Sequence, residues 1–534
     1  DDSKVIVPTT NSSTLTVNKA KDSLKVDIDA GVAGEDVVIT VNGPKDLKEN
    51  ITVTVDKNVY NVVLVNGSAK LTIKDLAAGN YNVTVTYSGD KNYEKQVIRT
   101  NFTVDINKKV NLNISDIVMI YKDGTRMVAV LTDYKGNPIA NATVYFTING
   151  VTYVRTTDVN GSASIGLNLG SGVYGASVYY NGSDMYDKVS KNITVTINPT
   201  VLADDLVKMY KNATKFSAKF TDSTGKALVN SDVRFNINGV IYEKRTNDKG
   251  TAMLTIALYP GSYILTAIHP NGEMFANNIT VLSTINSGDM TKYFKNGTQY
   301  YAKFVDGNGN PLINTEVKFN INGVFYTKKT DKDGVADLGI MLRPGSYILT
   351  AYNPVTGEEK GFNITVKSLI VQSDLTKYYL NASKFEATVY NKDGSLAVNK
   401  EVTFNINGVF YHKKTDENGV ASLGIALRPG NYTITTMYDG LDIGNKVSVL
   451  PTLVTKDLSM KYLDGSNFTA LTLDGQGKPL ANQNVSFNVN GVFYHKVTNK
   501  DGIASLGIRL MSGEYIITSY WNNFQTGNTI KISP

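Results

Sequence analysis

At 534 residues the chain is too long to fold around one hydrophobic core, so several domains are expected. It has no cysteine, which excludes disulfides and thiolate metal sites, and its three histidines argue against zinc sites and histidine-based catalysis. The net charge of +6 is spread over interspersed lysines and acids, which is typical of a solvated surface and not of a nucleic-acid groove.

The composition favours an all-β fold. Thr, Val, Ile and Tyr are abundant and favour strands, whereas the many Asn and Gly residues favour tight turns. No apolar run is long enough to span a membrane. The opening DDSKVIVPTTNSS has no signal-peptide pattern and is interpreted as an already processed or truncated start, from which a secreted parent could have lost its targeting and anchoring segments.

In chain order, a divergent first domain is followed by five closer copies. VNGSAKLTIKDLAAGNYNVTVTY at 65–87 matches ENGVASLGIALRPGNYTITTMY at 417–438. The motif FNINGVFY, or a close variant, starts at Phe146, Phe235, Phe319, Phe404 and Phe487. The glycines of its Asn-Gly pairs are 89, 84, 85 and 83 residues apart, which is the size of a small β-sandwich and too long for a solenoid repeat.

The sequence therefore predicts an all-β tandem array of six immunoglobulin-like β-sandwich domains forming an elongated rod. The predicted domains are 1–106, which includes an N-terminal extension, 107–199, 200–284, 285–369, 370–452 and 453–534. Turn signals in the copy at 374–449 divide it into about seven strands. The joints are short and lack linker composition, which indicates a semi-rigid string roughly 200 Å long.

The Asn407-Gly408 pair predicts a two-residue hairpin of type I′, because both positions of that turn need positive φ. In this hairpin Phe404, Ile406, Val409 and Tyr411 share one face, which is predicted to be the core face. Asn405 and Phe410 are placed on the opposite, outer face.

Two longer stretches carry a resemblance. FNINGVFYHKKTDENGVASLGIALRPGNYTITT at 404–436 and YNPVTGEEKGFNITV at 352–366 resemble the immunoglobulin-like repeats of adhesin-like surface proteins from methanogenic archaea. GNYNVTVTYSGDKNY at 79–93 is similar to the bacterial-type repeat. The resemblance implies an extracellular, cell-surface location and a role as an adhesin or its stalk. It implies no ligand-binding residue, because the shared motif consists of turn and core.

Phe325, Phe410 and Phe493 are predicted to lie on the outer face, where bulky aromatic side chains need a reason. Thr152 and Ile241 replace them in the other copies. Two interpretations stay open. A carbohydrate or protein ligand stacks on these rings, or a neighbouring strand or domain covers them; the second is favoured.

His412 and His495 occupy equivalent positions, and neither has a second histidine nearby in sequence. Both are predicted to be exposed strand residues and not metal ligands. No cofactor is expected.

The Asp-containing turns at Asp158, Asp331 and Asp416 are much shorter than an EF-hand loop and lack its closing glutamate. Asn247 and Asn499 replace the aspartate in the other copies, so these segments are predicted to be turns and not calcium sites.

Two Lys–Asn pairs are weighed as covalent crosslinks between the first and last strands. The candidate pairs are Lys208 with Asn278 and Lys292 with Asn363. Lys446 replaces the asparagine in the next domain, the last domain has neither partner, and no consistent buried acid is found. Surface lysines and strand-edge asparagines are the favoured explanation.

Asn-x-Ser/Thr sequons are abundant, as chance predicts for a chain rich in Asn and Thr. Asn296 and Asn381 lie in turns, so they are the candidate glycosylation sites if the host glycosylates secreted proteins.

No G-x-S-x-G, H-E-x-x-H, P-loop or dinucleotide-binding signature is present. The predicted function is a non-enzymatic cell-surface adhesin or stalk, with an unidentified glycan or protein of a host or microbial cell surface as its partner. The alternative is an array of carbohydrate- or wall-binding modules, appended to an enzyme outside this chain.

Overall fold

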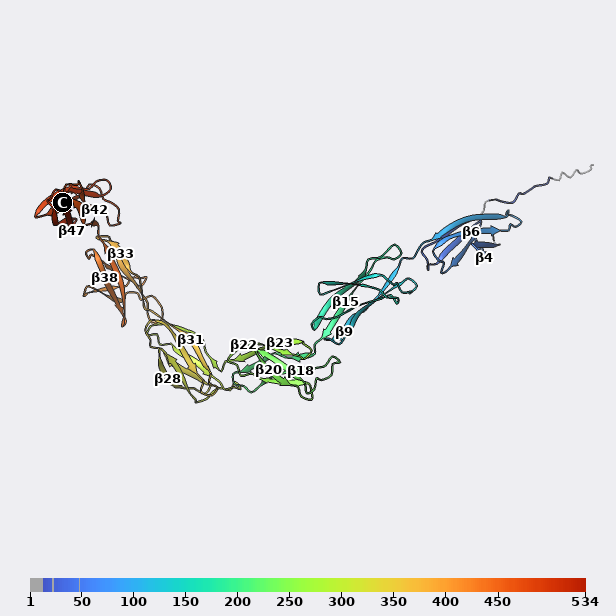
Figure 1. Ribbon diagram of the computed structural model, residues 1–534, viewed down its shortest axis with the longest axis horizontal. Coiled ribbons are helices and arrows are strands. Elements are labelled where there is room, and N and C mark those ends of the chain that lie inside the picture. The colour runs from blue at the N-terminus through green and yellow to red at the C-terminus, as the bar shows by residue number, and fades with distance from the viewer. Residues whose placement is uncertain (1–12, 22–23, 48) are drawn as a thin grey trace, which may run out of the picture. The chain divides into compact units, whose positions relative to one another are not determined.

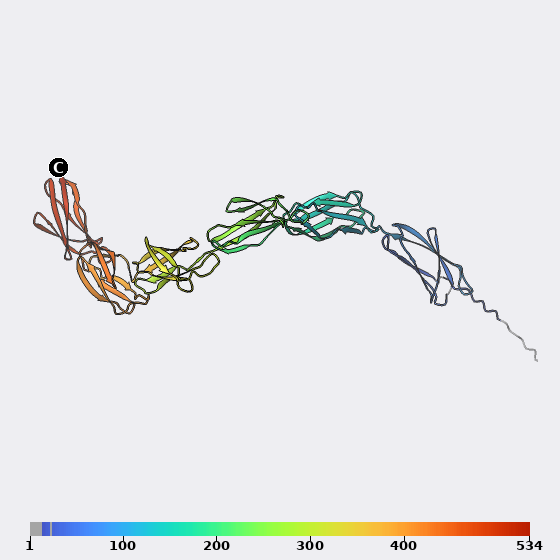
Figure 2. The ribbon, with the colours of Figure 1, turned by 90° about the horizontal axis from the view of Figure 1, so that it is seen from below.

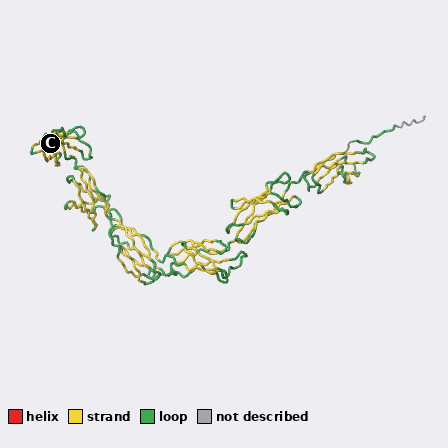
Figure 3. Tube along the Cα trace, viewed as in Figure 1, coloured by secondary structure: helices red, strands yellow, loops and turns green. Residues whose placement is uncertain are grey.

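The structure is a computed structural model that describes residues 13–21, 24–47 and 49–534. In these residues every regular element is a β-strand, and no helix is long or apolar enough to cross a membrane (Figure 3). The strands of the described residues form six pairs of sheets, each drawn from one contiguous stretch of chain (Figures 1 and 2). The predicted all-β tandem array of immunoglobulin-like sandwiches is confirmed. The domain boundaries stay a prediction.

The chain divides into two compact units. The first comprises the described residues up to 206, with 214–256 and 262–279, and the second comprises 207–213, 257–261 and 280–534. The division runs through the third sandwich.

The first sandwich pairs the sheets β1-β2-β5 and β4-β3-β6-β7. Its strands are β1 (Lys25–Asp29), β2 (Val37–Asn42), β3 (Asn50–Val55), β4 (Asn58–Val63), β5 (Ser68–Ile73), β6 (Gly79–Tyr87) and β7 (Gln96–Val104). The second sandwich consists of β8 (Val110–Asn113), β9 (Ile117–Ile120), β10 (Arg126–Asp133), β11 (Thr143–Ile148), β12 (Val151–Thr156), β13 (Ser162–Gly166), β14 (Gly172–Tyr180) and β15 (Val189–Asn198). The third consists of β16 (Val201–Ala203), β17 (Leu206–Met209), β18 (Lys215–Phe220), β19 (Asp232–Ile237), β20 (Val240–Arg245), β21 (Thr251–Thr255), β22 (Gly261–Ile268) and β23 (Met274–Leu282).

The fourth to sixth sandwiches lie in the second unit. The fourth consists of β24 (Ile285–Asn286), β25 (Met290–Tyr293), β26 (Gln299–Phe304), β27 (Glu316–Ile321), β28 (Val324–Lys329), β29 (Val335–Gly339), β30 (Gly345–Tyr352) and β31 (Glu359–Lys367). The fifth consists of β32 (Ile370–Gln372), β33 (Leu375–Tyr378), β34 (Lys384–Val389), β35 (Glu401–Ile406), β36 (Val409–Lys414), β37 (Val420–Gly424), β38 (Gly430–Tyr438) and β39 (Leu441–Leu450). The sixth consists of β40 (Leu453–Thr455), β41 (Leu458–Lys461), β42 (Asn467–Thr472), β43 (Asn484–Val489), β44 (Val492–Val497), β45 (Ile503–Gly507), β46 (Gly513–Trp521) and β47 (Phe524–Ser533).

The fifth sandwich illustrates the repeated topology, a three-stranded sheet β32-β34-β37 facing a five-stranded sheet β33-β39-β38-β35-β36. The first strand is broken in two: β32 pairs antiparallel with β34, and β33 crosses to pair in parallel with β39. At the crossing, Asp374 Oδ1 accepts hydrogen bonds from Lys446 N at 2.9 Å and Asn445 Nδ2 at 2.8 Å. The break explains why this copy has eight strands instead of about seven.

The predicted hairpin is confirmed. Ile406 pairs with Val409, Asn405 with Phe410 and Phe404 with Tyr411. The turn residues Asn407 and Gly408 have φ of 52° and 75°, the left-handed values that a type I′ turn requires.

Only half of the predicted core face is buried. Phe404 and Ile406 are in the core, and the Phe404 ring meets Phe385 edge to face with centroids 5.9 Å apart. Val409 and Tyr411 are 50% and 37% exposed, so their assignment to the core was wrong. They lie on β36, which pairs only with β35 at the edge of a five-stranded sheet, and the facing three-stranded sheet is too narrow to cover it.

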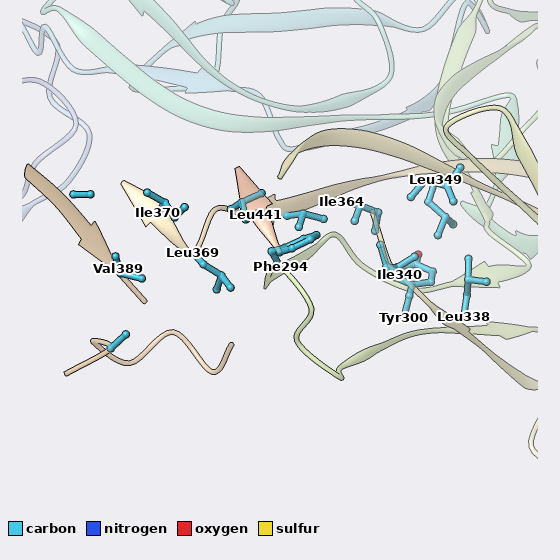
Figure 4. Packing of buried hydrophobic residues seen from close by; sticks show 14 of the residues in the cluster. Phe294, Tyr300, Leu338, Ile340, Leu349, Ile364, Leu369, Ile370, Val389 and Leu441 are labelled. Atoms are coloured by element: carbon cyan, nitrogen blue, oxygen red, sulfur yellow. The ribbon is translucent and has the colours of Figure 1, made fainter. Parts of the chain in front are cut away.

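Apolar side chains also fill the joint between the fourth and fifth sandwiches. Phe294, Leu369 and Leu441 are buried there, in one cluster that continues into both cores (Figure 4). Because this connection excludes water, it resists bending more than a solvated linker of the same length does.

Candidate functional site: exposed edge strands

The edge strand that follows the Asn-Gly turn is the surface that recurs from sandwich to sandwich. All six residues of β12, β20, β36 and β44 are exposed, and those of β28 are exposed or half-buried. Apart from Thr152 near the start of β12 and Val497 at the end of β44, each strand begins with apolar or aromatic side chains and continues into basic or polar ones. An exposed edge offers both unpaired backbone groups and side chains to a partner.

The three outer-face phenylalanines lie on these strands. Phe325, Phe410 and Phe493 are 61%, 55% and 54% exposed, so the favoured interpretation, that a neighbouring strand or domain covers them, was wrong, and their rings are open to a ligand. The Phe325 ring lies 5.8 Å from that of Tyr352, and Phe493 lies 5.9 Å from Tyr520, each within its own sandwich. These pairs broaden the aromatic surface, and recognition by it stays a prediction.

The two edge-strand histidines are exposed, as predicted, and each is paired across its hairpin. His412 Nδ1 lies 3.0 Å from Thr403 Oγ1 and 3.5 Å from Glu401 Oε1, and His495 Nδ1 lies 2.8 Å from Ser486 Oγ. Among the described residues, no group of three or more His, Asp or Glu side chains is arranged to hold a metal ion.

The Asp-containing segments are turns, as predicted. Asp416 Oδ1 accepts hydrogen bonds from the backbone N–H groups of Asn418 and Val420, both at 2.9 Å. Asn499 Oδ1 makes the equivalent bonds to Asp501 N at 2.9 Å and Ile503 N at 3.0 Å. A neutral amide therefore accepts the same two backbone hydrogen bonds as the carboxylate, which is typical of a turn residue and not of a calcium ligand.

The candidate crosslink partners Lys292 and Asn363 do not meet. Lys292 is buried, and its Nζ donates to Thr298 O at 2.8 Å and to Ile340 O at 3.0 Å. Asn363 is exposed, and its Nδ2 donates to Asp289 Oδ2 at 3.1 Å. In the third sandwich Lys208 is likewise buried, whereas Asn278 is exposed and bonds to Asp205.

The expectation of surface lysines was also wrong. Lys208, Lys292 and Lys377 are each buried, and burial lowers the pKa of each ammonium group. Met119 and Met460 occupy the same repeat position in the second and sixth sandwiches and are buried too. Because the copies carry either Lys or Met at this repeat position, the sequence already indicated that the position is interior.

The two candidate glycosylation sites use their amide nitrogens at joints between sandwiches. Asn296 Nδ2 donates to Lys392 O at 2.7 Å, and Asn381 Nδ2 donates to Gly475 O at 2.5 Å. Each Oδ1 accepts a hydrogen bond from the backbone two residues later, from Thr298 N and Ser383 N, at 2.8 Å. A glycan would be attached to the same nitrogen that bridges the joint, and glycosylation stays a prediction.

No family model matches the chain, and the curated proteins that it resembles include a bacterial adhesin. The chain is 25% identical over 561 aligned positions to the inverse autotransporter adhesin YeeJ of Escherichia coli (strain K12), covering 91% of this chain and 24% of that protein. The relative is an adhesin. The present chain spans about a quarter of its length.

Solved structures of low similarity include a Ca²⁺-stabilized adhesin that helps an Antarctic bacterium bind ice, with 16% identity, a TM-score of 0.18, and coverage of 66% of this chain and 100% of that one. Trypsin-activated α-2-macroglobulin from Escherichia coli has 12% identity and a TM-score of 0.22, covering 96% and 49%. A Bacteroides ovatus SGBP-B in complex with a mixed-linkage heptasaccharide has 14% identity and a TM-score of 0.16, covering 60% and 92%. TM-scores this low support no inference about function.

Proposed function

We propose that the chain is a non-enzymatic part of a cell-surface adhesin: a stalk of sandwiches whose exposed edge strands meet a glycan or protein on another cell. The observation that carries the proposal is the recurrence of exposed apolar edge strands, three of them with an outward phenylalanine. Similarity to an adhesin over 91% of the chain supports it. An extracellular location, an archaeal source and an elongated shape belong to the same proposal.

The edge strand is suited to recognition because folding does not need its outer side chain. Natural sheets usually protect an edge with charge, proline or a bulge. Here β36 carries Phe410 and Tyr411 before the basic residues Lys413 and Lys414. Such a strand provides an aromatic surface for stacking and a flanking positive charge for anionic partners.

The proposal is tested with beads coated with the full chain and presented to intact cells and to insoluble polysaccharides. The variant Phe325→Ala/Phe410→Ala/Phe493→Ala is expected to lose bead retention while its stability changes by only about 0.5 kcal/mol per site, because all three rings are largely exposed. The control Ile348→Ala/Ile516→Ala removes apolar side chains of similar exposure from β30 and β46 and is expected to keep retention. Equal retention by the triple variant and the wild type would refute the edge-strand site.

A further inference from the structure

The joint between the fifth and sixth sandwiches contains an open cleft of about 570 Å³, inside the second unit. Its lining includes Tyr379, Asp474, Gln483, Asn484, Trp521 and Asn522. A cleft of about 400 Å³ shares Asn484, Trp521 and Asn522 with it. Small-molecule sites are usually clefts of roughly 300–1,000 Å³, so either space can hold a ligand.

Trp521 is the only tryptophan in the chain, and a short hairpin holds it at the cleft. It ends β46 and pairs with Phe524, across a turn in which Asn522 and Asn523 have φ of 48° and 59°. The Phe524 ring packs on Tyr379 with centroids 5.7 Å apart. This contact fixes the hairpin on the fifth sandwich, and the indole stays half-buried.

The equivalent joint between the fourth and fifth sandwiches is occupied by ion pairs. Asp439 Oδ1 lies 3.7 Å from Lys295 Nζ, and Asp439 Oδ2 lies 3.2 Å from Lys392 Nζ. Its cleft has a volume of about 370 Å³, and its lining is mostly charged: Lys392, Asp393, Lys400 and Asp439, with Asn391 and Tyr438. Both joints keep the same asparagine-to-carbonyl bond, from Asn296 in one and Asn381 in the other, so their side chains can be compared position by position.

Five charged residues of that joint are neutral at the next one. Lys295, Lys392, Asp393, Lys400 and Asp439 correspond to Leu380, Gly475, Gln476, Gln483 and Asn522, and Tyr438 corresponds to Trp521. Loss of Lys295 and Lys392, the two lysines of the ion pairs, leaves open space. Loss of the charges leaves amide groups that can donate and accept hydrogen bonds without attracting an ion.

This combination matches the chemistry of a sugar. The C–H face of a pyranose ring packs on an indole, and its hydroxyl groups exchange hydrogen bonds with amides and a carboxylate. Asp474 is held in place because its Oδ1 accepts hydrogen bonds from Gln476 N at 2.9 Å and Lys478 N at 2.8 Å. One carboxylate does not make a cation site, and a phosphate would need more positive charge than Arg428, which lines the smaller cleft, supplies.

We propose that the Trp521 cleft binds a neutral oligosaccharide. This inference gives the proposed adhesin a ligand class, and its site is separate from the edge strands. Because Trp521 is the only indole, its fluorescence in the full chain reports on this cleft alone. The probes are maltohexaose, cellohexaose, mannohexaose and chitohexaose, titrated to millimolar concentrations. At least one is expected to change the emission with saturation, and no change with any of the four would overturn the proposal.

A variant that copies the preceding joint makes the test specific. Leu380→Lys/Gly475→Lys/Asn522→Asp keeps the fluorophore but restores the three residues of the ion pairs, and it is expected to weaken binding about tenfold or more, because it refills the cleft. Phe410→Ala is expected to leave the titration unchanged, which separates this site from the edge-strand proposal. Unweakened binding by the refilled variant would place the sugar elsewhere and refute the inference.

Discussion

The buried threonine after each edge strand provides the sharpest test of how the sandwiches are held together. In the second sandwich, Thr157 Oγ1 accepts a hydrogen bond from Ala142 N at 2.8 Å and donates one to Ile139 O at 2.7 Å, at 2% exposure. Thr157→Val keeps the volume and the two backbone bonds between Thr157 and residues 141 and 142, so only the hydroxyl is lost. A buried N–H left without an acceptor costs about 1–3 kcal/mol, so about 2 kcal/mol is expected.

Hydrogen exchange of the full chain, followed by mass spectrometry, measures this change in one sandwich. A loss of about 2 kcal/mol accelerates exchange of the most protected amides of β11 and β14 roughly 30-fold, while the other sandwiches are unchanged. Thr157→Ser retains the hydroxyl but loses one buried methyl group, so as the matched control it is expected to lose only about 1 kcal/mol, half the loss of Thr157→Val. Unchanged protection in Thr157→Val, or equal losses in the two variants, would refute the hydrogen-bond explanation.

Three further predictions follow from the interior and the joints. Burial lowers the pKa of Lys292, so its charged form destabilises the fold at neutral pH, and this cost fades as pH rises from the folded pKa toward the unfolded one. In denaturant titrations, the Lys292→Met variant should therefore be at least as stable as the wild type near pH 7, and this advantage in stability should shrink near pH 10. The control Lys303→Met, at an exposed lysine, should show no such trend. A loss of stability above about 1 kcal/mol in Lys292→Met near pH 7 would contradict this. Gly394 has a φ of 88°, and a Cβ there would lie 2.5 Å from the Tyr293 ring, so Gly394→Ala should raise hydrogen exchange at the fourth–fifth joint. Tyr293→Ala should relieve the part of this effect that comes from the ring contact but not the backbone strain, and equal exchange with and without the tyrosine would refute the close packing. Intact mass should equal the calculated mass, because each Lys–Asn crosslink would expel one ammonia, and a deficit would reinstate the crosslinks.

The hairpin was predictable because its determinants are local. Asn407-Gly408 sets the turn, the turn sets the register, and the register places Phe404 and Ile406 together. Alternation shows which side chains share a face but not whether another sheet covers that face. The error at Val409 and Tyr411 arose there, because exposure of β36 depends on the width of the facing sheet.

The joints could not be predicted, because their chemistry unites residues distant in sequence. Lys295 Nζ bonds to the carbonyl oxygen of Asp439, 144 residues away, and no local pattern links the two. Burial of Lys292 was missed for another reason: lysine is usually exposed, and two carbonyl partners at the end of its side chain make the exception tolerable. Comparison of the copies, which places Met460 at the same repeat position, is the sequence signal of this burial.

Exposed apolar edges also create a risk that bears on the proposed function. Edge strands rich in aromatic residues pair readily with other copies, and a string of them invites aggregation. Lys413 and Lys414 at the end of β36 oppose such pairing through like-charge repulsion, which salt screens. We expect self-association to increase at high ionic strength and to be reduced in the triple phenylalanine variant.

Small-angle X-ray scattering of the full chain is the direct test of the proposed stiff stalk of sandwiches. A rod of roughly 200 Å, from six domains of about ten strand residues each, has a radius of gyration of about 58 Å. A compact globule of the same length in residues would have a radius of about 24 Å. We expect a radius of gyration of about 58 Å, with a rod-like intermediate region in the scattering curve, and a value of about 24 Å would refute the stiff stalk.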